Sequence, residues 1–137
     1  MRLEEAIARH LRAHAGLTAL IAGRVYPVRL PPYATLPAVT YQRVGGRRYL
    51  AMGAPSGMAE ARMQFDAWSG PDRTEREPFA QVQSVAEQLR LALHGLSGHV
   101  QGLEIGAVTV LNELSLYEEG FYRVSMDAQV WYREAIA

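Results

Sequence analysis

Two stretches of this chain alternate apolar and polar residues strictly enough to predict a sheet with one buried face. Residues 59–68 place four apolar side chains on one side of a strand: Ala61, Met63, Phe65 and Ala67. Residues 122–132 do the same with six: Tyr122, Val124, Met126, Ala128, Val130 and Tyr132. Successive side chains of a strand point to opposite faces, so each stretch faces a core on one side and water on the other. Two such strands require another element that covers their apolar face.

The segment 79–93 has the apolar stripe of a helix that can cover this face. Its apolar residues recur at spacings of three and four: Phe79, Val82, Ala86, Leu89 and Leu93. Thr74 and Glu77 have the spacing of a capping box, whereas Pro78 fits only the first turn of a helix. We therefore expect the helix to begin at Thr74 or three to four residues later, and to end near Gly95.

The remaining segments predict a second helix and further strands. Leu3, Ile7 and Leu11 indicate an amphipathic N-terminal helix with Gly16 as its C-cap. Further along the chain we expect an apolar turn over 17–23, an edge strand over 24–28, a proline-rich loop over 29–37, strands over 38–44 and 103–111, and a turn over 117–120. Gly106 is a candidate β-bulge. The predicted fold class is α+β, one domain over residues 1–137: a mostly antiparallel β-sheet with one long helix packed on one face and an N-terminal helix beside it.

Composition excludes several classes of protein. The chain has 137 residues, 49% of them hydrophobic and 20% charged, as in a globular domain. No apolar run approaches the ~20 residues of a membrane span, and the N-terminal sequence does not fit a signal peptide. We therefore expect no membrane partner. The absence of cysteine excludes disulfides and thiol chemistry.

Charge is distributed unevenly along the chain. Residues 1–50 contain eight arginines and two glutamates, whereas residues 51–137 contain six arginines and twelve acidic residues. Oppositely charged halves can meet between copies of the same chain, since arginine suits interface ion pairs. All fourteen basic residues are arginine, which a GC-rich genome also explains. A formal net charge of zero argues against broad nucleic-acid binding.

The sequence holds no convincing catalytic, metal or cofactor motif. His10 and His14 share a helix face, but "HLRAH" lacks the glutamate of a metalloprotease and no third ligand is apparent. Ser56 in "APSGM" is not in a nucleophile elbow, and the glycine-rich stretches lack the Lys-Ser end of a phosphate loop. We therefore predict that the protein is not an enzyme and binds neither metal nor cofactor.

Two further residue groups have alternative interpretations. The first is acidic and lies at the end of one predicted strand and in its turn: Glu113, Glu118 and Glu119. Charged residues that guard a sheet edge explain it better than a catalytic carboxylate pair, which needs two different environments. The second is aromatic: Trp68, Trp131 and Tyr132. It is interpreted as core lids or subunit contacts, with a base-stacking platform as the alternative.

The stretch "GGRRYLAMGAPSG", residues 45–57, separates two predicted strands and is long for a hairpin turn, which usually has two to five residues. Long loops in compact domains are commonly functional or disordered. We expect a loop arm that is mobile alone and orders on a partner through five residues: Arg47, Arg48, Tyr49, Leu50 and Met52. The alternative is an exposed flexible loop without a partner.

The ordered segments "RVYPVRLPP", "LPAVTYQRVGG", "ARMQFDAW" and "LYEEGFYRVSMDAQVWYRE" resemble the tail-completion, or tail-terminator, proteins of long-tailed bacteriophages, prophages and gene-transfer particles. The resemblance implies a structural virion protein of the tail that assembles in the bacterial host cytoplasm. It also implies a homo-oligomeric ring, of six copies as in the characterised members of the family, that caps the tail-tube protein and joins the tail to the head-connector protein. The alternatives are a head-side adaptor or other minor virion protein, and a small-molecule enzyme or binding domain.

Overall fold

A computed structural model describes residues 2–70 and 77–135 of the chain. Its centre is one six-stranded sheet with the strand order β1-β2-β3-β6-β5-β4. The strands are β1 Val25–Pro27, β2 Ala38–Ala51, β3 Ala54–Ser69, β4 Gly98–Val100, β5 Leu103–Glu118 and β6 Phe121–Arg133. Each neighbouring pair is antiparallel except β1 with β2, which is parallel. The predicted α+β class with a mostly antiparallel sheet is thereby confirmed.

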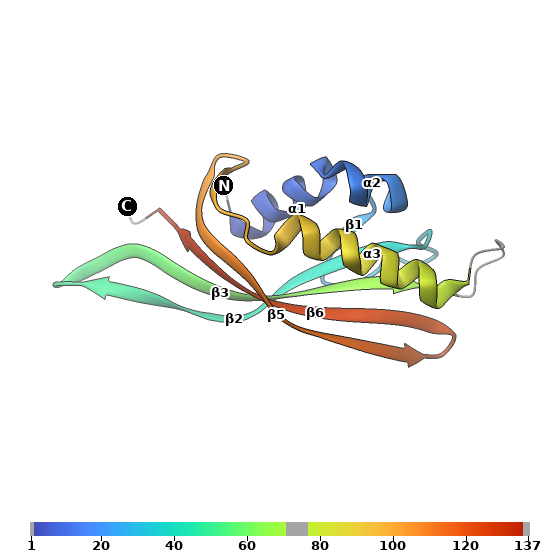
Figure 1. The fold of residues 1–137 in the computed structure, drawn as a ribbon. Coiled ribbons are helices and arrows are strands. Elements are labelled where there is room, and N and C mark those ends of the chain that lie inside the picture. Colours follow the sequence, from blue (N-terminus) through green and yellow to red (C-terminus); the bar gives the residue numbers. More distant parts are fainter. Residues whose placement is uncertain (1, 71–76, 136–137) are drawn as a thin grey trace.

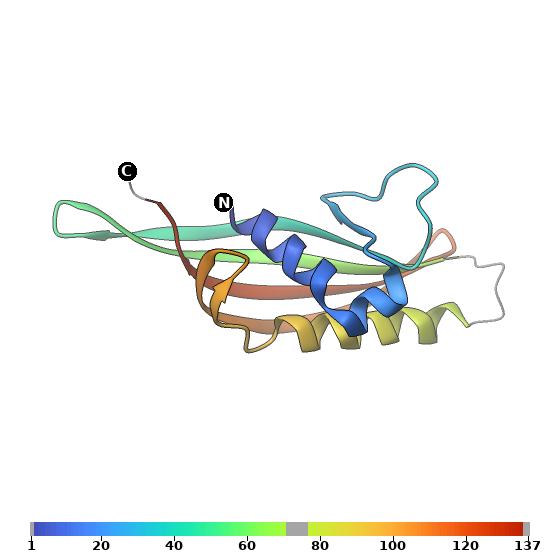
Figure 2. The same cartoon turned by 90° about the horizontal axis from the view of Figure 1, so that it is seen from above.

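Three helices pack on one face of this sheet, as Figures 1 and 2 show: α1 Leu3–Ala13, α2 Ala15–Ile21 and α3 Pro78–Leu93. The prediction of one long helix beside a single N-terminal helix is therefore wrong, because the N-terminal segment forms two helices that share the cover with α3. None of the described helices has the length and apolarity that crossing a membrane requires.

The break between α1 and α2 lies at His14, not at Gly16 as predicted. His14 has extended backbone, and its Nδ1 accepts a hydrogen bond from the Leu17 N–H at 3.3 Å, so one residue ends α1 and caps α2. Gly16 lies inside the first turn of α2, where an added Cβ would overlap the Gln88 side chain of α3. The glycine therefore permits close helix packing rather than helix termination.

Helix α3 begins at Pro78, the later of the two predicted starts. The Glu77 carboxylate is the N-cap and accepts hydrogen bonds from the N–H groups of Phe79 at 3.0 Å and Ala80 at 2.8 Å. Pro78 occupies the first turn, where its missing N–H removes no helical bond. Glu77 is thus the cap itself, and Thr74 lies outside the described residues.

The buried core lies between the helices and the face of β3 and β6 that alternation predicts. All four predicted residues of β3 are completely buried, and Phe65 is the largest side chain among the fully buried ones. On β6 the buried residues are Val124, Met126, Ala128, Val130 and Tyr132, while Tyr122 is partly buried against the core. In register, Phe65 lies opposite Met126 and Ala61 opposite Val130, so the two apolar faces coincide.

Other local predictions are also confirmed. Pro27 lies on the edge strand β1, and the register of β5 against β6 shifts between Ile105 and Ala107, which places a bulge at Gly106. The tight turn from β5 to β6 has φ of 51° at Glu119 and 87° at Gly120. Such paired positive φ values match the twist of the two strands it joins.

Candidate binding surfaces

The segment 45–57, here called the hairpin arm, is not the loop that the sequence predicted. Strands β2 and β3 continue through it in register to Ala51 opposite Ala54, which leaves only Met52 and Gly53 as the turn. The arm runs out beyond the helix layer, at the left of Figures 1 and 2. It is therefore a two-stranded projection with a defined backbone.

One glycine of the arm, Gly46, serves strand pairing rather than flexibility. Gly46 has a φ of 147°, and a Cβ there would overlap the Glu60 carbonyl oxygen and lie 3.0 Å from the Ala61 Cα. Only glycine lets β2 approach β3 this closely. A second register shift falls between Arg48 and Leu50. The glycine content of this segment predicted a loop because the sequence does not show that Gly46 faces a partner strand.

Tyr49 anchors the base of the arm to the sheet. Its ring stacks on Trp131 with the centroids 5.6 Å apart, and its hydroxyl donates a hydrogen bond to Glu60 Oε2 at 2.9 Å. Ser56 closes the same region by donating its hydroxyl hydrogen bond to the Tyr49 carbonyl at 2.7 Å. Burial and the Glu60 carboxylate raise the pKa of Tyr49. Hydrogen bonds from Gln129 and then Tyr49 lower the pKa of Glu60.

Arg48 anchors the arm to the C-terminal segment on the helix side. Its Nε donates to Glu134 Oε1 at 2.5 Å, and the Glu134 N–H donates to the Gly57 carbonyl at 2.8 Å. Arg47 lies opposite Glu60, on the other side of the strand, and is exposed. Exposed surface ion pairs stabilise a fold only slightly, so Arg48 orients the arm more than it holds the domain together.

The tip of the arm is apolar and fully open to solvent. Leu50 is 81% exposed and Met52 103%. Thus the five predicted residues divide into groups: Arg48 and Tyr49 face back toward the body of the protein, and Leu50 and Met52 are presented outward at the tip. Arg47 is exposed but lies beside Tyr49 and Glu60 at the base of the arm. The sequence grouped these five residues as one binding segment. Only the structure distinguishes the side chains that hold the arm to the protein from those that are exposed to a partner.

The aromatic residues proposed as a stacking platform do not come together. Trp131 stacks on Tyr49, while Tyr132 lies on the opposite, helix-covered face and is 7% exposed. Trp68 lies at the far end of β3, where Arg123 sits 5.0 Å above its ring and its Nε1 donates to Thr40 Oγ1 at 2.9 Å. The geometry favours the interpretation as lids and contacts, since these three rings do not form a continuous row.

The face of the sheet opposite the helices is polar and internally paired. Arg62 donates to the Asp127 carboxylate, Gln129 to Glu60, and Gln64 Nε2 to Asp66 Oδ2 at 3.0 Å. Asp66 is only 5% exposed, and its Oδ1 accepts no hydrogen bond from the described residues. The Asp127 and Glu60 carboxylates of this face are thus each paired with a donor from a neighbouring strand.

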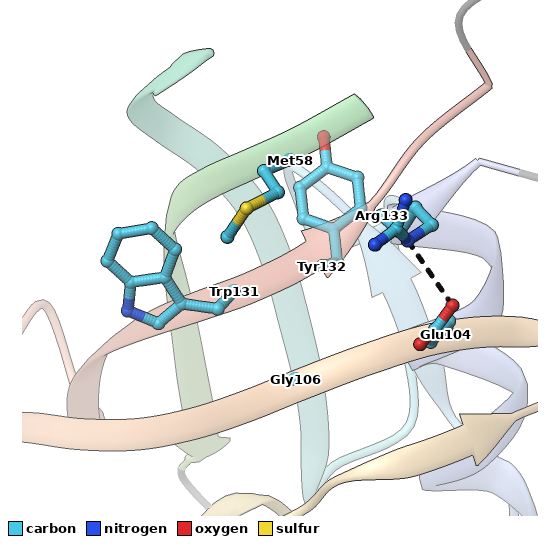
Figure 3. A pocket seen from close by; sticks show the side chains of 6 residues that line it. All are labelled: Met58, Glu104, Gly106, Trp131, Tyr132 and Arg133. Atoms are coloured by element: carbon cyan, nitrogen blue, oxygen red, sulfur yellow. Dashed lines mark ion pairs between the residues drawn. The ribbon is translucent and has the colours of Figure 1, made fainter. Parts of the chain in front are cut away.

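Two hollows of the protein are lined by paired charges. Figure 3 shows one of about 120 Å³ beside the arm, where Arg133 of β6 and Glu104 of β5 form an ion pair of 3.4 Å. A larger one, of about 560 Å³, lies near both termini and is lined by two ion pairs, Arg43–Glu4 and Arg48–Glu134, among other residues. These are surface depressions between paired side chains.

His10 and His14, predicted to share one helix face, have different structural roles. His10 Nε2 lies 2.8 Å from the Ala92 carbonyl at the end of α3, and His14 caps α2. Within residues 2–70 and 77–135, no group of three or more potential ligands among His, Cys, Asp and Glu is placed to hold a metal ion.

Comparison with known proteins places this architecture in a family. The chain matches the model of the family described as tail completion protein gp17 over residues 5–133. A chain in the solved structure of the virion of a native gene transfer agent particle has the same fold, with a TM-score of 0.76 at 18% identity over 96% of this chain and 94% of that chain. No curated protein gives a significant match. Because the family match spans nearly the whole chain, the protein belongs to the tail completion protein gp17 family, and it is a structural protein of a phage-type virion tail.

Proposed function

We propose that the protein closes the end of the tail tube as a ring of identical subunits, six in number by analogy with the family, and joins the tail to the head connector. Family membership and the likeness to a chain of a gene transfer agent virion support this role. Assembly then takes place in the cytoplasm of the bacterial host. The virion context requires a surface that binds other tail proteins.

The observation that carries the proposal is the hairpin arm. It presents two large apolar side chains, Leu50 at 81% and Met52 at 103% exposure, on a backbone held by strand pairing. Apolar side chains on a rigid projection act as anchors that fill pockets of a partner, and preorganisation lowers the entropy that binding costs. The arm therefore docks on the tail-tube protein or on a neighbouring subunit, with the exposed Arg47 contributing charge at its base.

The remaining predicted site residues have supporting roles in this proposal. Arg48 and Tyr49 hold the arm in its projecting direction through Glu134, Glu60 and Trp131. Their contribution to partner binding is indirect, because both side chains are occupied within the subunit. Replacing either one alters the direction of the arm rather than its contact chemistry.

The test is addition of the purified protein to tails that lack it, followed by electron microscopy of labelled protein and counting of joined particles. Label at the tube end and restored joining support the proposal. Label on the head vertex in the absence of tails would favour a head-side adaptor instead. Light scattering with and without tail-tube protein measures ring formation, and a strict monomer under both conditions would contradict the ring.

A further inference from the structure

The outer edge of β2 has a long stretch without a backbone partner. Strand β1 pairs with β2 only from Val39 to Tyr41, and the Val28 N–H extends this contact by donating to the Tyr41 carbonyl at 2.8 Å. Beyond that point, from residue 42 to 51, no described residue forms a backbone hydrogen bond with the outer edge of β2. Such an edge is a template for another strand.

The outer edge of β5, on the opposite side of the sheet, is open in the same way. Strand β4 covers only Leu103–Ile105. The two residues that follow α3 then bond to the outer edge of β5: the Gly95 N–H donates to the Val108 carbonyl at 2.8 Å, and the Val110 N–H donates to His94 Nδ1 at 3.1 Å. Past Val110, residues 111–118 pair with β6 on their inner side, and the part of the chain that the structure describes supplies no strand for their outer edge.

These two open edges carry opposite charges. The β2 stretch contains Arg43, Arg47 and Arg48 and no acidic residue. Arg43 and Arg48 form ion pairs with Glu4 and Glu134 of the same subunit, so Arg47 is the arginine of this edge that faces a neighbouring copy. The β5 stretch and its turn contain Glu113, Glu118 and Glu119 and no basic residue. Pairing of like edges would bring like charges together, whereas pairing of β2 with β5 brings opposite charges together.

Apolar side chains accompany the charges on both edges. Val44 is 50% exposed on β2, and Leu111 and Leu114 are 47% and 54% exposed on β5. Charged residues alone would discourage pairing at an edge, but apolar residues interspersed with complementary charges favour a specific partner.

The strand directions fit head-to-tail pairing. Strands β2, β3, β6 and β5 are successive antiparallel neighbours, so β2 and β5 of one subunit run in opposite directions. The register across the sheet places Ser115 level with Val39, so a second copy in the same orientation must also be displaced along the strands to bring residues 42–51 of its β2 antiparallel to residues 111–118 of β5 in the first. Heterologous contacts of this kind generate closed rings when the rotation between copies closes.

We propose that residues 111–118 of β5 in one subunit pair antiparallel with the outer edge of β2, residues 42–51, in the next, so that the sheet continues from copy to copy. This inference rests on the proposed ring and specifies its contact. Glu113 and Glu118 then recognise the neighbouring subunit instead of guarding an exposed edge.

The absence of native cysteine permits a clean crosslinking test. The double variant Val44→Cys/Ser115→Cys is assembled into tails and treated with a short bis-maleimide, with each single variant as the matched control. Head-to-tail pairing predicts a ladder of multimers in the double variant and monomer in both singles. A ladder that is missing from tails still able to join heads would overturn the proposal, as would dimers in either single variant.

A charge-exchange experiment tests the same contact without crosslinking. One variant, Arg47→Glu, places an acidic residue on the β2 edge and leaves the Arg48–Glu134 pair intact; the other, Glu113→Arg/Glu118→Arg, makes the β5 edge basic. Each alone repels its own copies, and we expect joined particles to fall about tenfold or more. Mixed together, each acidic β2 edge meets a basic β5 edge and each native edge meets its native complement, so alternating rings restore joining.

The controls are charge reversals on the exposed surface of α3, Arg90→Glu and Glu87→Arg, which leave both edges intact. Wild-type joining by either edge variant alone would overturn edge pairing, and so would failure of the mixture while both variants retain the wild-type unfolding midpoint. If Arg47 instead contacts the tail tube, the basic β5 variant cannot rescue the acidic β2 variant. Tube capping therefore survives that result, whereas edge pairing does not.

Discussion

Gly46→Ala tests whether the hairpin arm is a strand-paired element. The residue has a φ of 147°, and its Cβ would overlap the Glu60 carbonyl oxygen, so the substitution strains β2 and pushes it away from β3. Backbone held in such a region costs about 1–3 kcal/mol, and displacement of the adjoining strand adds to this. We expect a loss of about 3 kcal/mol in the free energy of unfolding, or local opening of the arm.

The neighbouring Gly45 is a matched control. Its added Cβ would come no closer than 4.0 Å to the Arg62 Cβ, and its φ is not positive. Gly45→Ala should therefore be neutral or stabilising by about 0.4–1 kcal/mol, because alanine restricts the unfolded chain. Any difference between the two adjacent variants arises from the approach of β2 to β3 and not from loss of glycine as such.

Two measurements cover the two ways in which the strain can be relieved. Urea unfolding reports a global loss of stability, and hydrogen exchange of residues 45–60 with limited trypsin digestion after Arg47 and Arg48 reports opening of the arm alone. Strand pairing predicts slow cleavage of the wild-type protein and fast cleavage of Gly46→Ala. Equal stability together with equal exchange in both glycine variants would show that the arm is a loop after all.

Three further predictions follow from the core, the arm tip and Glu60. Phe65→Ala should lower the free energy of unfolding by about 3–5 kcal/mol and Val130→Ala by about 2 kcal/mol, because both side chains are completely buried. In the same urea titration, the surface changes Arg62→Ala and Gln129→Ala should each lower it by about 1 kcal/mol or less. Losses in these surface variants as large as those in the core variants would refute the assignment of the buried and exposed faces. Leu50→Asp with Met52→Asp should leave the unfolding midpoint unchanged and abolish joining in the add-back assay, whereas normal joining would mean that the tip contacts nothing. The folded state lowers the pKa of Glu60, so its contribution to stability is present above the unfolded pKa of about 4.3 and is lost as pH falls through the lower folded pKa. The fluorescence of Trp131, which stacks on Tyr49 beside Glu60, should change in this acid range, and its pH profile should be flatter in Glu60→Gln. Identical pH profiles of the two proteins would contradict the coupling.

Local patterns predicted those features that depend on one element at a time. Alternation over 59–68 and 122–132 identified the buried face of the sheet, since the period of a strand is independent of its partner. The positions of Pro27, Gly106 and the 117–120 turn followed from backbone chemistry alone. The presence of a partner-binding role in the stretch 45–57 stays a prediction, on the same five residues, now divided between anchors and presented side chains.

Features that depend on a second segment were decided by tertiary structure. Gly16 was interpreted as a helix end because glycine commonly occurs there, yet it lies against Gln88 of α3, 72 positions along the sequence. Gly45 and Gly46 suggested a loop, yet the backbone of β3 at Glu60 makes one of them a pairing residue. The Tyr49–Trp131 stack joins side chains from β2 and β6, which are not neighbours in the sheet.

The sequence alone determined the fold class, the two principal strands and their buried face, because these follow from short-range periodicity and the need to bury apolar surface. Only the tertiary structure decided where the helices break, that the segment 45–57 is a projecting hairpin, and that basic and acidic residues lie on opposite open edges of one sheet. The physical reason is that a glycine, a charge or an aromatic ring has a role only relative to the segment it faces, and strand order and register bring that segment into contact from a distant part of the chain.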